Sequence, residues 1–435
     1  MNWTLNPAAA PPVPYPAGLK RIIGGDAHRE AVAEITAWPG YAPTPIRTAA
    51  KLASSLGLEA VWVKDESGRF GLGSFKALGG AYGIQRVMKA RAGRAARFAG
   101  SGRQDHPAST AGAARDDGLR SAAGQPDHAP VPTTVTCASD GNHGRAVAWG
   151  ARMFGCDAVV YLPAHVTEVR AAAIRSFGAR VVRVDGEYDD AVARAARDAA
   201  RNGWTVISDT SYPGYMEIPR HVMVGYTIMI DEALDALLPM SDDDKYMIGH
   251  PTTTTPDNPR VSRRAPPTGP APPTHIFIQG GVGGLAAAAI GHAWERLGAD
   301  RPVAVIVEPA AADGLLQSAL AGKPSASRGD LHTIMAGLSC REISPLAWEI
   351  VGRGAHAFMT VPEDGIAPLM RAAARGKLGE AFEGGESGVA GLLGLIEVAR
   401  DEERRHALGL DERSRVLVFN TEGATDPELY ARIVD

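Results

Sequence analysis

The sequence predicts an α/β protein whose parallel β-sheets are covered by helices, and three observations support this prediction. Between residues 133 and 210, short runs rich in valine alternate strictly with segments of helical composition. The same strand–helix–strand order returns at residues 274–309, around a cluster of glycines. The 435 residues, of which 45% are hydrophobic, are enough for two or three domains with a large core. Strict alternation of strands and helices is typical of parallel sheets with helices on their faces.

The individual elements follow from apolar runs, periodicity and turn residues. Strands are expected within residues 58–67, 133–139, 157–163, 179–186, 204–210, 274–279, 302–309 and 414–423. Helices are expected at residues 74–91, 143–155, 167–178, 188–203, 221–238 and 285–298. Ser74 has the side chain of an N-cap for the first of these helices. Residues 1–20, rich in proline and alanine, are expected to lie loosely on the surface.

Two segments, residues 96–131 and 241–273, show no hydrophobic periodicity and are of low complexity. Segments of this composition bury too little apolar surface to fold by themselves. We interpret both as insertions into one compact α/β core, not as linkers between independent domains, and we expect the first to be mobile.

Charge and cysteine content argue against several classes of protein. The net charge is −4 and no basic tract stands out, so no nucleic-acid partner is expected. There is no run of eighteen or more apolar residues that would predict a membrane span, and the N-terminus lacks the pattern of a secretory signal. Cys137, Cys156 and Cys340 are scattered, without a CxxC motif or a disulfide framework. We therefore expect a cytoplasmic protein, and we predict no metal site.

Lys76 is the first candidate for chemistry, because it stands at the predicted start of a helix. The helix dipole disfavours an ammonium group at that end. A lysine is useful there when its amine is neutral or forms a Schiff base, for which a depressed pKa is expected. A solvated surface lysine is the ordinary alternative.

Polar residues also follow two other predicted strands. The turn at residues 139–144, Ser-Asp-Gly-Asn-His-Gly, contains Asp140, a candidate acid or base, and Asn142, which can bind a ring hydroxyl or phenolate. Asp and Asn commonly form Asx turns and helix caps, so a structural role is the alternative. Thr421 ends the last predicted strand and either faces a ring nitrogen or belongs to an ordinary turn.

A glycine loop between a predicted strand and helix contains Gly280, Gly281, Gly283 and Gly284. Such a loop lets several amides point inward and suits a phosphate. It also matches the dinucleotide pattern GxGxxA, with Glu308 at the end of the next strand, where a ribose-binding acid belongs. A nicotinamide cofactor would explain this loop alone. Pyridoxal phosphate would explain the loop, the lysine, the asparagine and the threonine together.

Five motifs carry a family resemblance: VKDESGRFGLGSFKALGGAYG, DGNHGRAVAW, DTSYPGYMEIP, TIMAGLSC and NTEG. In these motifs the chain resembles the pyridoxal-phosphate enzymes of the tryptophan synthase β type (fold type II), and within that type it is most similar to the diaminopropionate ammonia-lyase family. The resemblance covers most of the chain outside the two insertions. It implies two parallel-sheet, three-layer domains with pyridoxal 5'-phosphate in the cleft between them. The large domain would comprise residues 1–81 and 206–435, and the small domain residues 82–205.

The resemblance also implies a reaction: α,β-elimination of D- and L-2,3-diaminopropionate to pyruvate and two ammonia molecules. It implies Lys76 as the Schiff-base lysine and the base for the L-isomer, and Asp140 as the base for the D-isomer. Removing the Cα proton from opposite faces of a planar imine needs a base on each face. Dehydratases of this fold type usually have a small residue where this chain has Asp140.

Further roles are implied residue by residue. Asn142 would contact the ring oxygen of the cofactor, and Thr421 would lie near its pyridine nitrogen. Asp209 would receive the distal ammonium of the amino-acid substrate, which Asp140 would also contact. The phosphate loop would consist of Gly280, Gly281, Val282, Gly283 and Gly284. A homodimer is expected.

Two other functions stay open. The first is a serine or threonine dehydratase or a β-replacement enzyme, against which Asp140 and Asp209 argue. The second is a pyridoxal-phosphate-binding protein without turnover, against which the intact Lys76 and Asp140 argue. The chain also departs from some relatives, which carry a cysteine where it has Gly314, so that a disulfide with Cys340 cannot form here.

Overall fold

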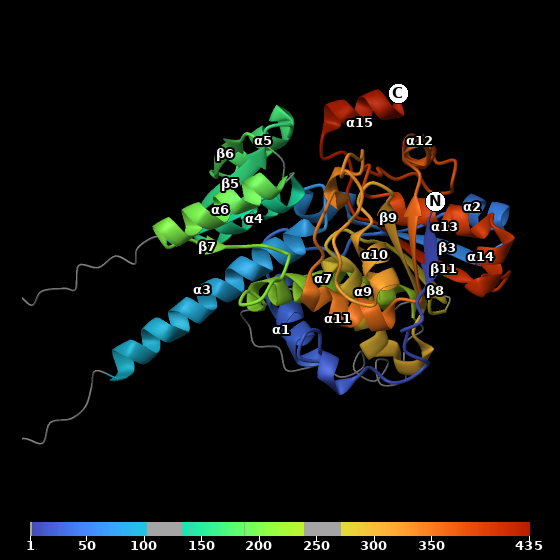
Figure 1. The fold of residues 1–435 in the computed structure, drawn as a ribbon, viewed down its shortest axis with the longest axis horizontal. Coiled ribbons are helices and arrows are strands. Elements are labelled where there is room, and N and C mark those ends of the chain that lie inside the picture. Colours follow the sequence, from blue (N-terminus) through green and yellow to red (C-terminus); the bar gives the residue numbers. More distant parts are fainter. Residues whose placement is uncertain (1, 102–132, 140, 187, 239–270) are drawn as a thin grey trace, which may run out of the picture.

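The strands that the structure describes form two separate sheets (Figure 1). The structure is a computed structural model that describes residues 2–101, 133–139, 141–186, 188–238 and 271–435. The seven-stranded sheet has the order β1-β10-β9-β8-β11-β3-β2, and the four-stranded sheet has the order β6-β5-β4-β7. The large sheet is parallel except at its edges, where β1 and β2 pair antiparallel to their neighbours, and the small sheet is parallel throughout.

The large sheet is covered by helices on both faces. One face packs against α1, α3, α7, α9 and α11, and the other against α2, α12 and α13. Successive side chains of β8 point to opposite faces of the sheet. Ile276 and Ile278 pack in the core on the α7 and α9 side, and Phe277 packs in the core on the α13 side. The strands of this sheet are β1 (Trp3–Leu5), β2 (Ile46–Thr48), β3 (Ala60–Asp65), β8 (His275–Gln279), β9 (Val303–Pro309), β10 (Ala357–Val361) and β11 (Arg415–Asn420).

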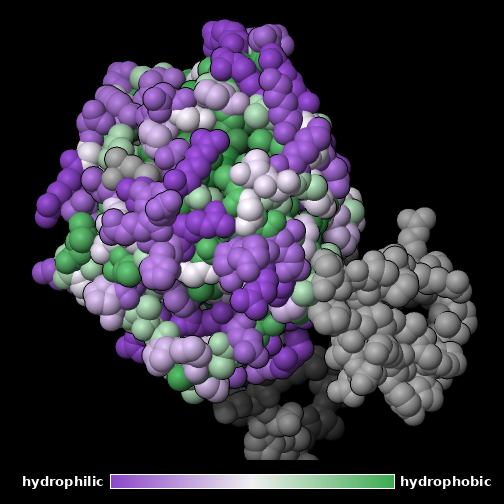
Figure 2. Space-filling model, turned by 90° about the vertical axis from the view of Figure 1, so that its right-hand side faces the viewer, coloured by the Kyte–Doolittle hydropathy of each residue, from purple (hydrophilic) through white to green (hydrophobic). Residues whose placement is uncertain are grey.

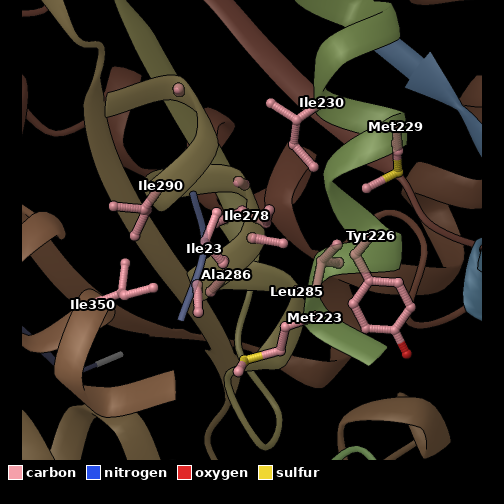
Figure 3. Packing of buried hydrophobic residues seen from close by; sticks show 14 of the residues in the cluster. Ile23, Met223, Tyr226, Met229, Ile230, Ile278, Leu285, Ala286, Ile290 and Ile350 are labelled. Carbon is pink, nitrogen blue, oxygen red and sulfur yellow. The ribbon is translucent and has the colours of Figure 1, made fainter. Parts of the chain in front are cut away.

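Most of the helices that the structure describes belong with the large sheet. They are α1 (Gly25–Ile35), α2 (Ala50–Leu56), α3 (Lys76–Ser101), α7 (Glu217–Leu237), α9 (Gly284–Leu297), α10 (Gly314–Ala321), α11 (Pro345–Gly354), α12 (Ile366–Ala374), α13 (Ala390–Ala399), α14 (Glu402–Ala407) and α15 (Pro427–Val434). Figure 3 shows how α7 and α9 pack together, with Met223 from α7 beside Leu285 from α9.

The small sheet repeats the three-layer arrangement on a smaller scale. Val135 and Val160 pack with α4 and α5 on one face, whereas Val159 and Tyr161 pack with α6 on the other. Its elements are β4 (Thr134–Ala138), α4 (Asn142–Phe154), β5 (Asp157–Pro163), α5 (Glu168–Arg175), β6 (Arg180–Val184), α6 (Tyr188–Asn202) and β7 (Thr205–Val206). The predicted α/β class with parallel, helix-covered sheets is confirmed.

We call the small sheet with α4, α5 and α6 the small unit, and the large sheet with its helices the large unit. Helix α3 connects them, because it packs against α4 of the small unit and α7 of the large unit. Both contacts depend on glycine. A Cβ at Gly225 on α7 would lie 2.2 Å from the carbonyl oxygen of Leu78, and one at Gly150 on α4 would lie 2.7 Å from the Cα of Ala81. The backbones therefore approach more closely than any larger residue would allow. The predicted domain boundaries at 81/82 and 205/206 stay a prediction.

The prediction for residues 1–20 is wrong. Trp3–Leu5 pair with β10 as an edge strand, and Tyr15 and Leu19 are buried. The indole Nε1 of Trp294 donates a hydrogen bond of 2.7 Å to the carbonyl oxygen of Val13. Aromatic and leucine side chains spaced between the prolines provide this anchoring, which composition alone does not reveal.

The predicted insertions fall largely outside the described residues. Helix α3 continues to Ser101, so the first insertion does not begin at residue 96, and its residues 102–131 are not described. Of the second insertion, only residues 271–273 are described.

The surface view in Figure 2 shows a face on which hydrophilic side chains dominate and hydrophobic ones are scattered between them. Among the helices that the structure describes, none is both long enough and apolar enough to span a membrane.

The contact between α3 and α7 predicts a strong effect of adding a single methyl group. We expect Gly225→Ala to lower the free energy of unfolding by about 3 kcal/mol, because the new Cβ would meet backbone that cannot rotate away. Gly93→Ala is the matched control, since Gly93 lies on the exposed part of α3 with no atom within 4 Å of its Cβ position. We expect that control to gain up to about 1 kcal/mol from helix propensity. Urea unfolding measures both, and a Gly225→Ala variant as stable as the wild type would contradict the close approach.

Candidate active site

A single pocket collects side chains from both sheets at the carboxyl ends of their strands. It is lined by residues that follow β4, β7, β8 and β11 and by the start of α3. Of the residues predicted from sequence, Lys76, Asn142, Asp209, Gly280, Gly281, Val282, Gly284 and Thr421 line it. Gly283 belongs to the same loop but does not line the pocket, and Asp140 lies outside the described residues.

Lys76 is the first residue of α3, and its Nζ donates a hydrogen bond of 2.6 Å to Oδ2 of Asp209. The ammonium also lies 5.3 Å from the centre of the Phe75 ring. Burial lowers the pKa of Lys76, but the Asp209 carboxylate outweighs burial, and the net pKa lies well above its usual value. The expectation of a depressed pKa is therefore wrong in this state of the site, because it did not include the carboxylate.

Asp209 follows β7 and is buried. Burial raises the pKa of its carboxyl group, whereas Lys76 and His143 lower it, and the net pKa lies below its usual range. Asp209 is therefore an ionised carboxylate inside the pocket, and its partner is an alkyl ammonium. The imidazole ring of the neighbouring His143 is held in place by a hydrogen bond of 2.8 Å between its Nε2 and the carbonyl oxygen of Ile207.

The turn between β4 and α4 is organised by Ser139. Its Oγ accepts hydrogen bonds from the amides of Gly141 and Gly144, at 2.9 and 2.8 Å, which closes the turn at the helix start. Asn142 is the first residue of α4, and its Nδ2 donates a hydrogen bond to Oε2 of Glu422. The second oxygen of Glu422 accepts a hydrogen bond of 2.9 Å from the amide of Ser387. Asn142 thus has a fixed orientation in the pocket.

The glycine loop joins β8 to α9 and has backbone angles that favour glycine. Gly281 and Gly283 have φ angles of 64° and 95°. A Cβ at Gly280 would lie 2.4 Å from Cγ of Glu308. The first amides of an α-helix have no partner within the helix and carry partial positive charge. The loop therefore brings an anion-binding helix end to the pocket.

Glu308, the candidate ribose-binding acid, has a different task. It is fully buried, and its two carboxylate oxygens accept hydrogen bonds of 3.0 and 2.9 Å from the amides of Leu315 and Leu316 in the first turn of α10. Burial raises the pKa of Glu308 to about 8. The carboxyl group satisfies a helix end inside the protein, so it does not serve as a ribose ligand.

Thr421 directly follows β11, and its carbonyl oxygen accepts a hydrogen bond of 3.2 Å from the amide of Phe75. This bond ties the end of the strand to the residue before Lys76. The contact explains how two residues far apart in sequence come to share one pocket.

Several residues that line the pocket were not predicted from the sequence: Arg170, Tyr188, Tyr226, Gln279, Cys340, Ser387 and Glu422. Glu422 could have been found, since it follows Thr421 in the motif NTEG. Arg170 and Tyr188 lie at helix starts of the small unit, and nothing in their local sequence indicates the pocket.

A cluster outside the pocket consists of His28, Asp231 and His292, whose ligand atoms lie within 4.8 Å of one another. Asp231 accepts hydrogen bonds from His292 Nε2 at 3.0 Å and from Arg296 at 2.6 Å. The guanidinium group neutralises the carboxylate, so hydrogen bonding accounts for this cluster.

Comparison with known proteins defines the class of this protein. The model of a family described as "Pyridoxal-phosphate dependent enzyme" matches residues 131–243 and 265–422. The chain therefore belongs to the family of pyridoxal-phosphate-dependent enzymes, and pyridoxal 5'-phosphate is its cofactor. The nicotinamide alternative is wrong.

Particular relatives give a closer match. The chain is 33% identical to a diaminopropionate ammonia-lyase of Salmonella typhimurium over 430 residues, which cover 95% of this chain and 93% of the relative. The diaminopropionate ammonia-lyase of Escherichia coli K12 is 33% identical over 400 residues, covering 91% and 88%. The crystal structure of the holo Escherichia coli enzyme matches with a TM-score of 0.77 at 29% identity, over 100% of this chain and 96% of that one. The resemblance seen in the sequence motifs is confirmed.

The residues of the pocket fit the cofactor. Lys76 would offer an amine to its aldehyde, the start of α9 would offer amides to its phosphate, and Asn142 would offer an amide to its ring oxygen. The side-chain Oε1 of Gln279, which also lines the pocket, is buried and has no hydrogen-bond partner among the described residues. An unsatisfied buried acceptor of this kind is typical of a site that receives a polar ligand.

Glu308 predicts a pH dependence of stability. Its pKa is higher in the folded protein than in the unfolded chain, so between pH 5 and 8 the folded state binds more protons. Its contribution to stability therefore falls as pH rises, by at most about 1.4 kcal/mol per pH unit. In Glu308→Gln this fall is absent, so the destabilisation relative to the wild type should be larger at pH 5 than at pH 8. Urea unfolding across this range tests it, with the exposed Glu403→Gln as control. A difference between variant and wild type that does not change with pH would contradict the assignment.

Proposed function

We propose that the enzyme catalyses the α,β-elimination of D- and L-2,3-diaminopropionate to pyruvate and two ammonia molecules. The observation that carries this proposal is the ion pair between Asp209 and Lys76, in which a carboxylate inside the pocket holds an alkyl ammonium at 2.6 Å. The distal amino group of diaminopropionate is a group of the same kind. A serine or threonine hydroxyl carries no charge and gains less from such a partner. The names of the relatives support the same substrate.

The proposed roles divide between the two units of the fold. Lys76 holds the cofactor through its amine and removes the Cα proton of the L-isomer, and Asp140 removes that of the D-isomer. The bound cofactor supplies an electron sink for the negative charge that develops at Cα. Asp209 binds the distal ammonium and so fixes which group leaves.

The remaining roles concern the cofactor itself. Asn142 contacts its ring oxygen through the second hydrogen of an amide that Glu422 already orients. The loop from Gly280 to Gly284 binds its phosphate, and Thr421 lies near the pyridine nitrogen. A hydroxyl does not keep that nitrogen protonated, which favours elimination over transamination.

The decisive experiment measures pyruvate release from pure D- and pure L-2,3-diaminopropionate separately, with L-serine and L-threonine alongside. Rapid pyruvate from both diaminopropionate isomers supports the proposal. 2-Oxo acid from serine or threonine alone would make the enzyme a dehydratase. No product from any of them, with the cofactor bound, would make it a protein without turnover.

The two-base assignment predicts a split between isomers. We expect Asp140→Asn to reduce kcat for the D-isomer by about 100-fold or more, the scale of a lost general base, and to leave the L-isomer within about tenfold of the wild type. Lys76→Ala should lose turnover of both isomers together with the visible absorption of the bound cofactor. Equal losses on both isomers in Asp140→Asn would refute the assignment.

Asp209 predicts a change in substrate preference. We expect Asp209→Asn to lower kcat/KM for diaminopropionate by about 10- to 100-fold, the value of one hydrogen bond to a charged group. Inhibition by L-serine, which has no distal charge, should weaken by less than about threefold. The exposed Asp300→Asn serves as control. If kcat/KM for diaminopropionate and inhibition by L-serine weaken by the same factor, Asp209 does not bind the distal ammonium.

We further infer that the enzyme acts in the cytoplasm as a homodimer. The three cysteines of the described chain are free, which suits a reducing compartment. Analytical ultracentrifugation and cell fractionation test these two points.

A further inference from the structure

Tyr226 is a buried residue of α7 whose ring is fixed by its surroundings. Its ring centre lies 4.7 Å from that of Phe75. Gly79 leaves room for one edge of the ring, since a Cβ there would lie 2.4 Å from Cε1 of Tyr226. Gly284 lies near the other edge, where a Cβ would be 4.0 Å from Cε2. Helices α3, α7 and α9 therefore hold the ring in one position.

The hydroxyl group of Tyr226 is not explained by this packing. It is buried and makes no hydrogen bond of ordinary length with the described residues, although the Lys76 side chain lies close enough to lower its pKa. Such a group costs about 1–3 kcal/mol, so a phenylalanine would fill the space at lower cost. Figure 3 shows the hydroxyl pointing away from the isoleucine and methionine side chains, and Tyr226 lines the pocket. The hydroxyl is thus directed toward the site of the chemistry.

The nearest charged groups are those of the Lys76–Asp209 pair. Lys76 Nζ lies 5.9 Å from the centre of the Tyr226 ring. Burial raises the pKa of Tyr226 well above its usual value, Lys76 offsets part of this, and Asp209 adds to it. The phenol is neutral at every working pH, and its oxygen can accept a hydrogen bond from an ammonium.

We propose that Tyr226 is a positioning residue for Lys76, whose nitrogen donates a hydrogen bond to the Tyr226 hydroxyl in the holoenzyme and keeps it when Asp209 binds the substrate. The inference rests on the proposed function, in which two ammonium groups compete for the Asp209 carboxylate. Once the distal ammonium of the substrate takes Asp209, Lys76 needs another acceptor close by. Tyr226 supplies it and keeps the Lys76 nitrogen from turning away from Cα.

The test compares the holoenzyme forms of Tyr226→Phe and Tyr82→Phe. Tyr82 is a buried tyrosine of α3 that does not line the pocket, so its variant controls for the loss of a tyrosine hydroxyl outside the site. The first readout is the pH midpoint of the visible absorption band of the bound cofactor, which reports protonation at the Lys76 nitrogen. The other titratable groups that face Lys76 are Asp209 and Cys340, with His143 beyond Asp209. All of them are unchanged in both variants.

We expect the midpoint to fall by about one pH unit in Tyr226→Phe, because the protonated nitrogen loses an acceptor worth about 1.4 kcal/mol. The kcat for L-2,3-diaminopropionate should fall about tenfold with KM within twofold, and the D-isomer should be affected less. Tyr82→Phe should match the wild type in both readouts.

Two results would overturn the proposal. One is an unchanged pH midpoint in a folded Tyr226→Phe holoenzyme. The other is a shifted midpoint that Tyr82→Phe shows equally, which indicates a general effect of losing a tyrosine hydroxyl. The absorbance titration needs no turnover. If the wild type releases no pyruvate from either isomer, the proposed function fails, but the midpoint still decides whether Tyr226 contacts Lys76.

Discussion

The close packing of α7 against α3 and the residues before it determines where Lys76 lies, and the site depends on this contact. Gly225 lets the two backbones meet, and Tyr226 fills the space beside Gly79. About two turns further along α7, Glu232 holds the segment that precedes Lys76. Lys64 Nζ and Arg69 Nη2 both donate to Oε2 of Glu232, at 2.5 and 2.7 Å, in a buried network.

This network makes α7 a support for the whole stretch from β3 to Lys76. A charge pair as buried as that of Lys64 and Glu232 is costly to break, because the remaining charge would be left in the interior. Lys76, the proposed cofactor lysine, is thus fixed by packing on one side and by charge on the other. A short shift of α7 would move Lys76 relative to the glycine loop, since α9 packs against the same helix.

Much of this arrangement could be predicted from the sequence, for reasons that are local. The strands and helices from β4 to β9 have clear periodicity and glycine-marked ends, and the glycine loop and Asn142 stand at strand–helix junctions. β1 and β2 escaped prediction because each has three residues, too few to show alternation. The raised pKa of Lys76 could not be foreseen, because its cause, Asp209, lies 133 positions further along the chain. The task of Glu308 was likewise hidden, since its partners belong to the start of α10.

The two-sheet architecture gives a physical reason for the two bases proposed above. A planar group bound between two sheets has one face toward each unit, so acids or bases on opposite faces come most simply from different units. Lys76 starts α3, beside the large sheet, whereas Asp140 comes two positions after the end of β4, a strand of the small sheet, in the sequence. The hydrogen bond between Asn142 and Glu422 joins the small unit to the large unit at the pocket.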